Sequence, residues 1–273
     1  MRNRLVAAET DAHVQPNTAL RATRPLTPER RLRQNRPSRD IQRRPPHGLL
    51  TDDQETLRDF QSRYARPAGE VEEWARDAEQ DGIALAEVID QVHPTILVGT
   101  SGQGGAFTEP IVRAMADHTQ RPLVLPMSNP TDLAEATPAD LLAWTEGRAL
   151  IATGSPFDPV EHDGTTHQIA QANNALIFPG LGLGAIVARA TTVTDSMLVA
   201  AAHAVAGRVE ATVAGASLLP PIPELRETSA MVAIAVARAA ADDGVAQNPV
   251  DDDIETRIRA AMWQPGYPTI EAV

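Results

Sequence analysis

Residues 95–108 read TILVGTSGQGGAFT, and this stretch decides the fold that we expect for the chain. A short apolar run, rich in β-branched residues, leads directly into a loop with four glycines. Such a run, bounded by turn residues, is typical of a strand buried in a parallel sheet. Ligands of these sheets bind in loops at the carboxyl ends of the strands. We therefore expect the loop to contact a ligand, because glycine lets backbone N–H groups approach an anion or a ring closely.

Two further loops have the same character. One reads MSNPT at residues 127–131 and follows the apolar run at 123–126, and the other contains the pair Asn173 and Asn174. An asparagine amide both donates and accepts hydrogen bonds, which suits a carboxylate, a ribose or a nicotinamide amide. Glycine and asparagine also serve in turns that bind nothing, so for Gly99, Ser101 and Gly102 both interpretations stay open.

Helical patterns separate these strands. Thr108 and Thr137 stand where a helix N-cap is expected, and Pro138 occupies the first helical position after the second cap. A third strand is expected at 149–152, with further helices at 182–190, from 194 onward, at 224–241 and at 251–262. The βαβαβ alternation predicts an α/β protein with a doubly wound parallel sheet of Rossmann type, followed by C-terminal helices.

Composition excludes several kinds of chemistry. The chain has no cysteine, so it has no disulfides and no thiolate metal site, and we expect a cytoplasmic location. All 24 basic residues are arginine, which removes any mechanism that needs a lysine base or a Schiff base. No run of 18 apolar residues and no signal peptide is visible, and we expect no membrane partner.

Residues 1–46 differ from the rest of the chain. They hold eleven arginines, four acids and six prolines, without a sustained apolar period, so we expect disorder. A basic arm for nucleic acid is one interpretation. A solvated tail, or a non-native N-terminus from a shifted reading frame, is the one that we favour, and we expect no nucleic-acid partner.

Order is expected to begin at residue 47. Thr51, followed by acids, resembles the start of a helix. The acids Asp52 and Asp53 are interpreted as helix-start charge and not as metal ligands. His162 and His167 lie in a polar stretch and are expected to be solvated.

From about residue 48 to residue 246 the sequence resembles the C-terminal, NAD-binding region of malic enzymes. The motifs that carry the resemblance are GLL at 48–50, VGTS at 98–101, GAFT at 105–108, SNPT at 128–131, EAT at 135–137, TEGRA at 145–149, ATGSPF at 152–157, NN at 173–174, IFPG at 177–180 and VTD at 193–195. Their common order and spacing make the resemblance specific.

The resemblance implies oxidative decarboxylation of (S)-malate to pyruvate and CO₂ with NAD or NADP and Mg²⁺ or Mn²⁺. It implies that Asn129 contacts malate and cofactor, and that one of the paired asparagines binds the malate carboxylate in the same pocket. The implied cofactor-binding residues are Gly99, Ser101, Gly102, Ser128, Asn129 and Gly154, and the implied substrate-binding residues are Asn129, Asn173 and Asn174.

The sequence also departs from the family pattern. No G-x-G-x-x-G precedes Gly48, no lysine base exists, and neither Tyr64 nor Tyr267 matches the motif of the catalytic tyrosine. The metal-binding carboxylates of the family lie upstream of the region present. We thus expect no catalytic residue and no metal ligand in this chain, and an incomplete sheet with an exposed edge.

Two hypotheses follow. The first is a truncated malic enzyme: a disordered segment at 1–46, a partial NAD-binding domain at 47–247 and a C-terminal helix or tail at 248–273, inactive alone. The second is a non-catalytic module that associates with a full-length homologue. Either way, a homo-oligomer or association with homologous subunits is expected.

Overall fold

The computed structural model describes residues 5–9, 48–54, 57–76, 82–264 and 266. The chain forms two compact units, Met1–Ile169 (unit 1) and Ala170–Val273 (unit 2). Each unit has its own cluster of buried apolar side chains. Within the described residues no helix is long and apolar enough to span a membrane.

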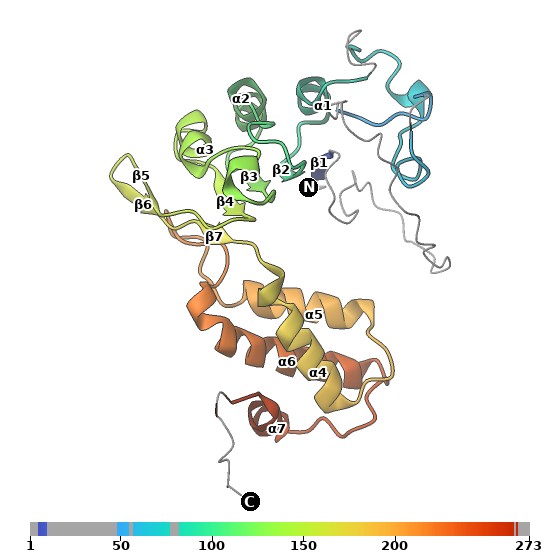
Figure 1. The fold of residues 1–273 in the computed structure, drawn as a ribbon, viewed down its shortest axis with the longest axis vertical. Coiled ribbons are helices and arrows are strands. Elements are labelled where there is room, and N and C mark those ends of the chain that lie inside the picture. Colours follow the sequence, from blue (N-terminus) through green and yellow to red (C-terminus); the bar gives the residue numbers. More distant parts are fainter. Residues whose placement is uncertain (1–4, 10–47, 55–56, 77–81, 265, 267–273) are drawn as a thin grey trace, which may run out of the picture. The chain divides into compact units, whose positions relative to one another are not determined.

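Unit 1 is built on a parallel sheet. Its strands follow one another in the order β1 (Leu5–Glu9), β2 (Ile96–Thr100), β3 (Leu123–Pro126) and β4 (Leu150–Thr153). Three helices line one face of this sheet in Figure 1: α1 (Leu85–Val92), α2 (Glu109–His118) and α3 (Pro138–Trp144). This arrangement confirms the predicted α/β class, because each parallel crossover requires a connection on a face of the sheet.

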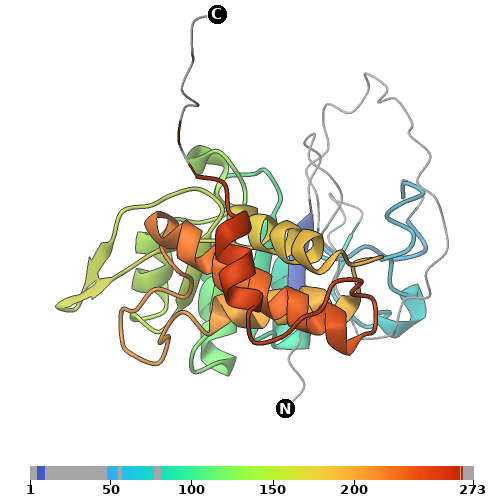
Figure 2. The same ribbon diagram turned by 90° about the horizontal axis from the view of Figure 1, so that it is seen from below.

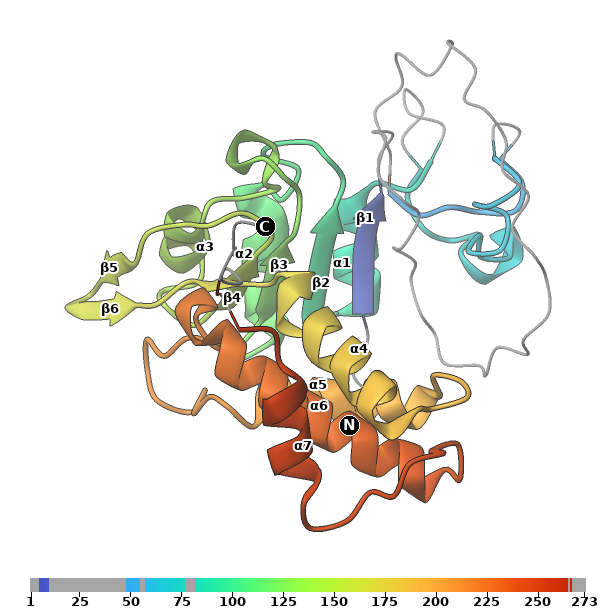
Figure 3. The ribbon, with the colours of Figure 1, turned by 60° about the horizontal axis from the view of Figure 1, so that its bottom comes forward.

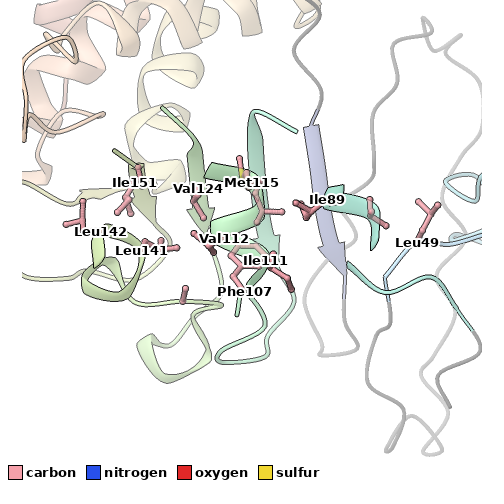
Figure 4. Close-up of a cluster of buried hydrophobic side chains, with 14 of the residues drawn as sticks. Leu49, Ile89, Phe107, Ile111, Val112, Met115, Val124, Leu141, Leu142 and Ile151 are labelled. Carbon is pink, nitrogen blue, oxygen red and sulfur yellow. The ribbon is translucent and has the colours of Figure 1, made fainter. Parts of the chain in front are cut away.

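The buried side chains of these elements form one apolar cluster, shown in Figure 4. Val124 and Ile151 project from the strands onto Val112 and Met115 of α2 and Leu141 of α3. Thr137 caps α3 as its sequence predicts, since its side chain accepts a hydrogen bond from the N–H of Asp140. The Thr137 cap predicted from the sequence and the buried apolar side chains therefore define the same helix, α3.

The N-terminal segment contains a strand that the sequence does not predict. Residues Leu5–Glu9 form β1, which pairs in parallel with β2 from Leu5↔Ile96 to Glu9↔Thr100 (Figure 3). These five residues differ from the expected disorder, and β1 covers the edge of β2 that we expected to be exposed. The rest of residues 1–46 lies outside the described part of the chain.

Two local predictions in unit 1 are wrong. No helix begins at Thr51 in the described residues: Thr51 forms an isolated bridge with Arg66, and Asp52 accepts a hydrogen bond from the N–H of Ala68 at 2.8 Å. Asp52 therefore stabilises a turn, because the contacts of Thr51 and Asp52 with Arg66 and Ala68 override the local helix signal.

The second wrong prediction concerns the stretch at 162–167. It forms a hairpin of β5 (Val160–His162) and β6 (Thr165–His167), with Gly164 at positive φ in the turn. His162 and His167 lie edge to face, with ring centroids 6.3 Å apart, and the side chain of His162 is only 22% exposed. Burial, followed by the nearby His162, lowers the pKa of His167.

Unit 2 is helical. After β7 (Ala170–Gln171) it contains α4 (Phe178–Ala188), α5 (Asp195–Ala206), α6 (Leu225–Asp242) and α7 (Ile254–Ala261). The short 3₁₀ segments of the two units are η1 (Ala68–Glu70), η2 (Thr131–Leu133), η3 (Asn174–Leu176) and η4 (Ile222–Glu224). Figure 2 shows the helices of unit 2 packed side by side, in yellow to dark red.

The closest helix packing in unit 2 is that of α4 on α6. A Cβ atom added at Gly184 would lie 2.5 Å from the carbonyl oxygen of Ala233 and 2.9 Å from the Cβ of Val236. Glycine is therefore required there by the approach of the two backbones. Ile254 and Ile258 of α7 are also fully buried in this core, so the helix expected at 251–262 forms and is part of the packed unit.

The contact between α4 and α6 gives the first testable prediction. We expect Gly184→Ala to lower the free energy of unfolding by about 1–3 kcal/mol, because the added methyl group meets backbone. Urea unfolding followed by far-UV circular dichroism measures this.

Gly182 on the same helix is the matched control. A Cβ there meets nothing within 4 Å. Gly182→Ala should therefore raise stability by about 0.5–1 kcal/mol, since alanine loses less backbone entropy in a helix. Equal effects of the two substitutions would contradict the packing argument.

Candidate functional site

Three loops leave the carboxyl ends of β2, β3 and β4 on the same edge of the sheet. They are the glycine loop (residues 101–107), the Asn129 loop (127–131) and the Gly154 loop (154–157). Backbone hydrogen bonds hold them side by side, since the N–H of Met127 donates to the carbonyl of Gly99 at 2.8 Å and that of Gly154 to Pro126 at 3.0 Å. A parallel sheet thus brings together segments that lie far apart in sequence.

A buried carboxylate joins the first two loops. Oε1 of Glu135, which is fully buried, accepts from the backbone N–H and the hydroxyl of Ser101 at 2.6 and 2.7 Å. The same oxygen accepts from the Ser128 hydroxyl at 2.5 Å, and Oε2 accepts from the Ser128 N–H at 3.4 Å. Hydrogen bonds to a charged group contribute about 1.5–3 kcal/mol each, so this junction is a strong one.

The main chain at Glu135 also holds the far end of the glycine loop. Its carbonyl accepts from the N–H of Phe107 at 2.9 Å, while the carbonyl of the preceding Ala134 accepts from Gly105 at 3.2 Å. Gly99 makes room for the side chain, because a Cβ at Gly99 would lie 2.5 Å from the Glu135 carboxyl carbon. One residue therefore anchors the glycine loop at both ends.

Most backbone N–H groups of the glycine loop already have a hydrogen-bond partner. Those with a partner inside unit 1 are the N–H groups of Ser101, Gly102, Gln103, Gly105, Ala106 and Phe107. An N–H group that already has a partner offers little to a phosphate. Of the two ligand types expected from the sequence, an anion or a ring, this loop favours a ring or a ribose that packs against its outer surface.

Asn129 is exposed at the start of the second loop, and its amide is held at both ends. Its Oδ1 accepts from the hydroxyl of Ser155 at 2.6 Å, and its Nδ2 donates to the carbonyl of Met127 at 3.2 Å. The peptide bond to Pro130 is cis. An amide has two donors and two acceptor lone pairs, so one N–H and one lone pair stay available for a ligand.

Gly154 is required by the close approach of the Asn129 loop. A Cβ at this position would lie 2.1 Å from the carbonyl oxygen of Met127 and 2.9 Å from Nδ2 of Asn129. The presence of glycine at position 154 is thus explained by its packing against Asn129, the candidate ligand-binding residue. A larger residue would displace the asparagine amide.

The predicted residues divide between the two units. Unit 1 brings together Gly99, Ser101, Gly102, Ser128, Asn129 and Gly154. Glu135 is the residue that sequence reasoning missed as a site component. In the sequence Glu135 appeared only as part of the EAT motif at 135–137, and its position between two alanines is the one signal that could have drawn attention to it.

Asn173 and Asn174 lie at the start of unit 2 and differ in their surroundings. The side chain of Asn173 accepts from the N–H of Ala175 at 2.9 Å, so it caps η3. The amide of Asn174 is exposed and makes no side-chain hydrogen bond to the described residues. Of the pair, Asn174 has an amide that bonds to no described side chain or backbone group, while the Asn173 amide keeps its NH₂ group and one lone pair beside its capping bond.

The described residues include no group of three His, Asp or Glu side chains arranged to hold a metal ion. These described residues thus provide no such donor set for Mg²⁺ or Mn²⁺. The glycine and Asn129 loops offer a close-packed surface beside an anchored, exposed amide.

The family model described as the malic enzyme NAD-binding domain matches residues 33–241. The match begins inside the arginine-rich segment, upstream of residue 47, where we expected order to begin. The curated relatives include the NAD-dependent malic enzyme 3 of Bacillus subtilis, 55% identical over 227 residues, which are 83% of this chain and 40% of the relative. The NAD-dependent malic enzyme of Sodalis glossinidius is 48% identical over 221 residues, which are 81% of this chain and 39% of the relative.

Solved structures agree with these relatives. The malic enzyme of Pyrococcus horikoshii matches with a TM-score of 0.52 and 28% identity, over 67% of this chain and 38% of the other. That of Entamoeba histolytica has a TM-score of 0.55 at 24% identity, over 78% of this chain and 40% of the other, and supports the fold alone. This chain spans about 40% of the length of the relatives that it matches. It belongs to the malic enzyme family, and the matched residues are those of the NAD-binding domain.

Proposed function

We propose that unit 1 binds NAD, with the nicotinamide riboside part against the glycine loop and the Asn129 loop. The observation that carries the proposal is the Asn129 amide, held by Ser155 and Met127 at the carboxyl edge of a parallel sheet. Because most N–H groups of the glycine loop already have hydrogen-bond partners, they support a ring or ribose there in place of the pyrophosphate. The names of the relatives, NAD-dependent malic enzymes, support NAD over NADP.

The residues of this chain act by positioning. Bound NAD supplies the hydride acceptor of the reaction. The free N–H and lone pair of Asn129 can bind the carboxamide of nicotinamide or a carboxylate of malate, in a direction fixed by Ser155. In unit 2, we assign the free amide of Asn174 to the malate carboxylate, and Asn173 to the turn that presents it.

For a longer protein that contains this domain, we propose oxidative decarboxylation of (S)-malate to pyruvate and CO₂. Removal of the hydroxyl proton needs a base, and the developing enolate needs a positive charge. This chain has no lysine, and we found no metal-binding carboxylates in its described residues. The isolated chain is therefore proposed to bind ligands without turning them over.

A second candidate function is a module that associates with homologous subunits. Phe178 and Ile186 on α4 are 61% and 73% exposed, on a helix with no charged residue between them. Exposed apolar side chains on one helix face favour association. Light scattering of the purified chain, alone and with a full-length malic enzyme, distinguishes a monomer from a homo-oligomer and from a mixed complex.

The binding proposal predicts the effect of Asn129→Ala. We expect the Kd for NADH to rise about tenfold, the equivalent of about 1.4 kcal/mol, because one amide hydrogen bond to the ligand is lost. A titration of nicotinamide fluorescence measures the Kd.

Asn248→Ala is the matched control for this titration. Asn248 is also an anchored amide, which donates to the carbonyl of Val187 at 2.8 Å in unit 2, outside the three loops. It should leave the Kd unchanged. If unmodified protein does not bind NADH at millimolar concentration, the proposed function is wrong.

The inactivity proposal has its own measurement. With malate, NAD and Mn²⁺, we expect no NADH formation by the purified chain above the buffer rate, because a lysine base is absent. A full-length malic enzyme serves as the positive control. If an activity stays with the isolated chain through two chromatography columns, the inactivity proposal is overturned. The binding proposal is left intact by that result.

A further inference from the structure

Glu135 is a fully buried acid that the proposed function does not use directly. Among the described residues, its side chain accepts four hydrogen bonds, from Ser101 of the glycine loop and Ser128 of the Asn129 loop. Removing a carboxylate from water is costly unless its oxygens are paired. A site that places such a group between two ligand loops therefore fixes the geometry of both loops.

We propose that Glu135 is a positioning residue of the nucleotide site, which holds the glycine loop and the Asn129 loop in one arrangement through the Ser101 and Ser128 hydroxyls. The inference rests on the proposed function, since it concerns the same site. It makes Glu135 act on the ligand through other residues, without contact of its own.

The hydroxyl groups transmit this constraint because each one is used twice. The Ser128 hydroxyl donates to Glu135 and accepts from the N–H of Gly102 at 2.7 Å. The Ser101 hydroxyl donates to Glu135 and accepts from the N–H of Gln103 at 3.0 Å. A carboxylate that only accepts thus sets the direction of both hydroxyls, and the hydroxyls set the course of the glycine loop.

The same network extends to the candidate ligand amide. Asn129 follows Ser128 directly, and its amide is fixed on the other side by Ser155. A shift of Ser128 therefore moves Asn129 relative to its second anchor. A binding amide that is displaced by even a fraction of an ångström loses hydrogen-bond geometry.

The alternative is that Glu135 only stabilises unit 1. Thr145 provides the comparison, because it is equally buried, its hydroxyl donates to the carbonyl of Leu141 at 2.6 Å, and it accepts from the N–H of Ala149 at 3.1 Å. Thr145→Val removes buried hydrogen bonds of unit 1 without touching the three loops. A purely structural role of Glu135 would make the two sites behave alike.

The experiment compares Glu135→Gln, Ser128→Ala and Thr145→Val in the full chain. NADH is the probe, and the readouts are its Kd, the nicotinamide emission at saturation, and the thermal midpoint of unfolding. Glutamine keeps the shape of glutamate but turns an N–H₂ group toward the Ser128 N–H and loses the charge. We expect Glu135→Gln to raise the Kd about tenfold and to change the emission at saturation.

The controls decide between the two roles. Thr145→Val should lower the thermal midpoint and leave Kd and emission unchanged. Ser128→Ala should raise the Kd for NADH. The double variant Ser128→Ala/Glu135→Gln should have a Kd no higher than that of the single variant that binds NADH more weakly, because the two substitutions remove the same link. Should Glu135→Gln not fold, Ser128→Ala alone carries the test.

Three results would overturn the inference. One is an unchanged Kd in both Glu135→Gln and Ser128→Ala, while the unmodified chain binds NADH. Another is an equal loss of affinity in Thr145→Val, which would assign Glu135 to stability only. Absence of NADH binding by the unmodified chain would instead remove the proposed function, and the inference with it.

Discussion

The candidate site depends on one buried carboxylate, and the groups that donate hydrogen bonds to it in the described residues are all uncharged. In the part of the chain that the structure describes, Glu135 is paired by hydroxyl and backbone donors of Ser101 and Ser128. Such an arrangement satisfies the buried oxygens only while both loops stay in place. The stability of the junction and the geometry of the site are therefore the same property of the molecule.

The glycine-rich loop illustrates why a motif and its chemistry must be considered separately. Glycines after a strand are commonly associated with phosphate, because free N–H groups point outward. Here a Cβ at Gly104 of the loop would lie 2.4 Å from the carbonyl oxygen of Asp132, and in the neighbouring segments Gly99 makes room for the Glu135 side chain and Gly154 for the Met127 carbonyl. These glycines allow protein segments to approach each other, and the ligand meets the surface that this close packing creates.

Local sequence signals succeeded where the segment decides its own structure. Helix α2 begins directly after Thr108 as expected, although the Thr108 side chain makes no capping hydrogen bond, whereas Thr137 and Thr194 cap their helices with side-chain hydrogen bonds. They failed where a distant segment decides. Thr51 pairs with Arg66, and His162 lies against Gly147, where a Cβ would be 2.9 Å from the histidine ring.

The sequence by itself determined the family and the α/β class, because strand and helix patterns are local and motif order is linear. Its choice of Asn129, Asn173 and Asn174 as ligand residues stays a prediction. Only the tertiary structure decided that Asn173 caps a turn while Asn174 is free, and that Glu135 joins two loops. Ser101 and Glu135 are 34 residues apart, so no local period links them. They meet because parallel strands bring the loops at their carboxyl ends to one edge of the sheet.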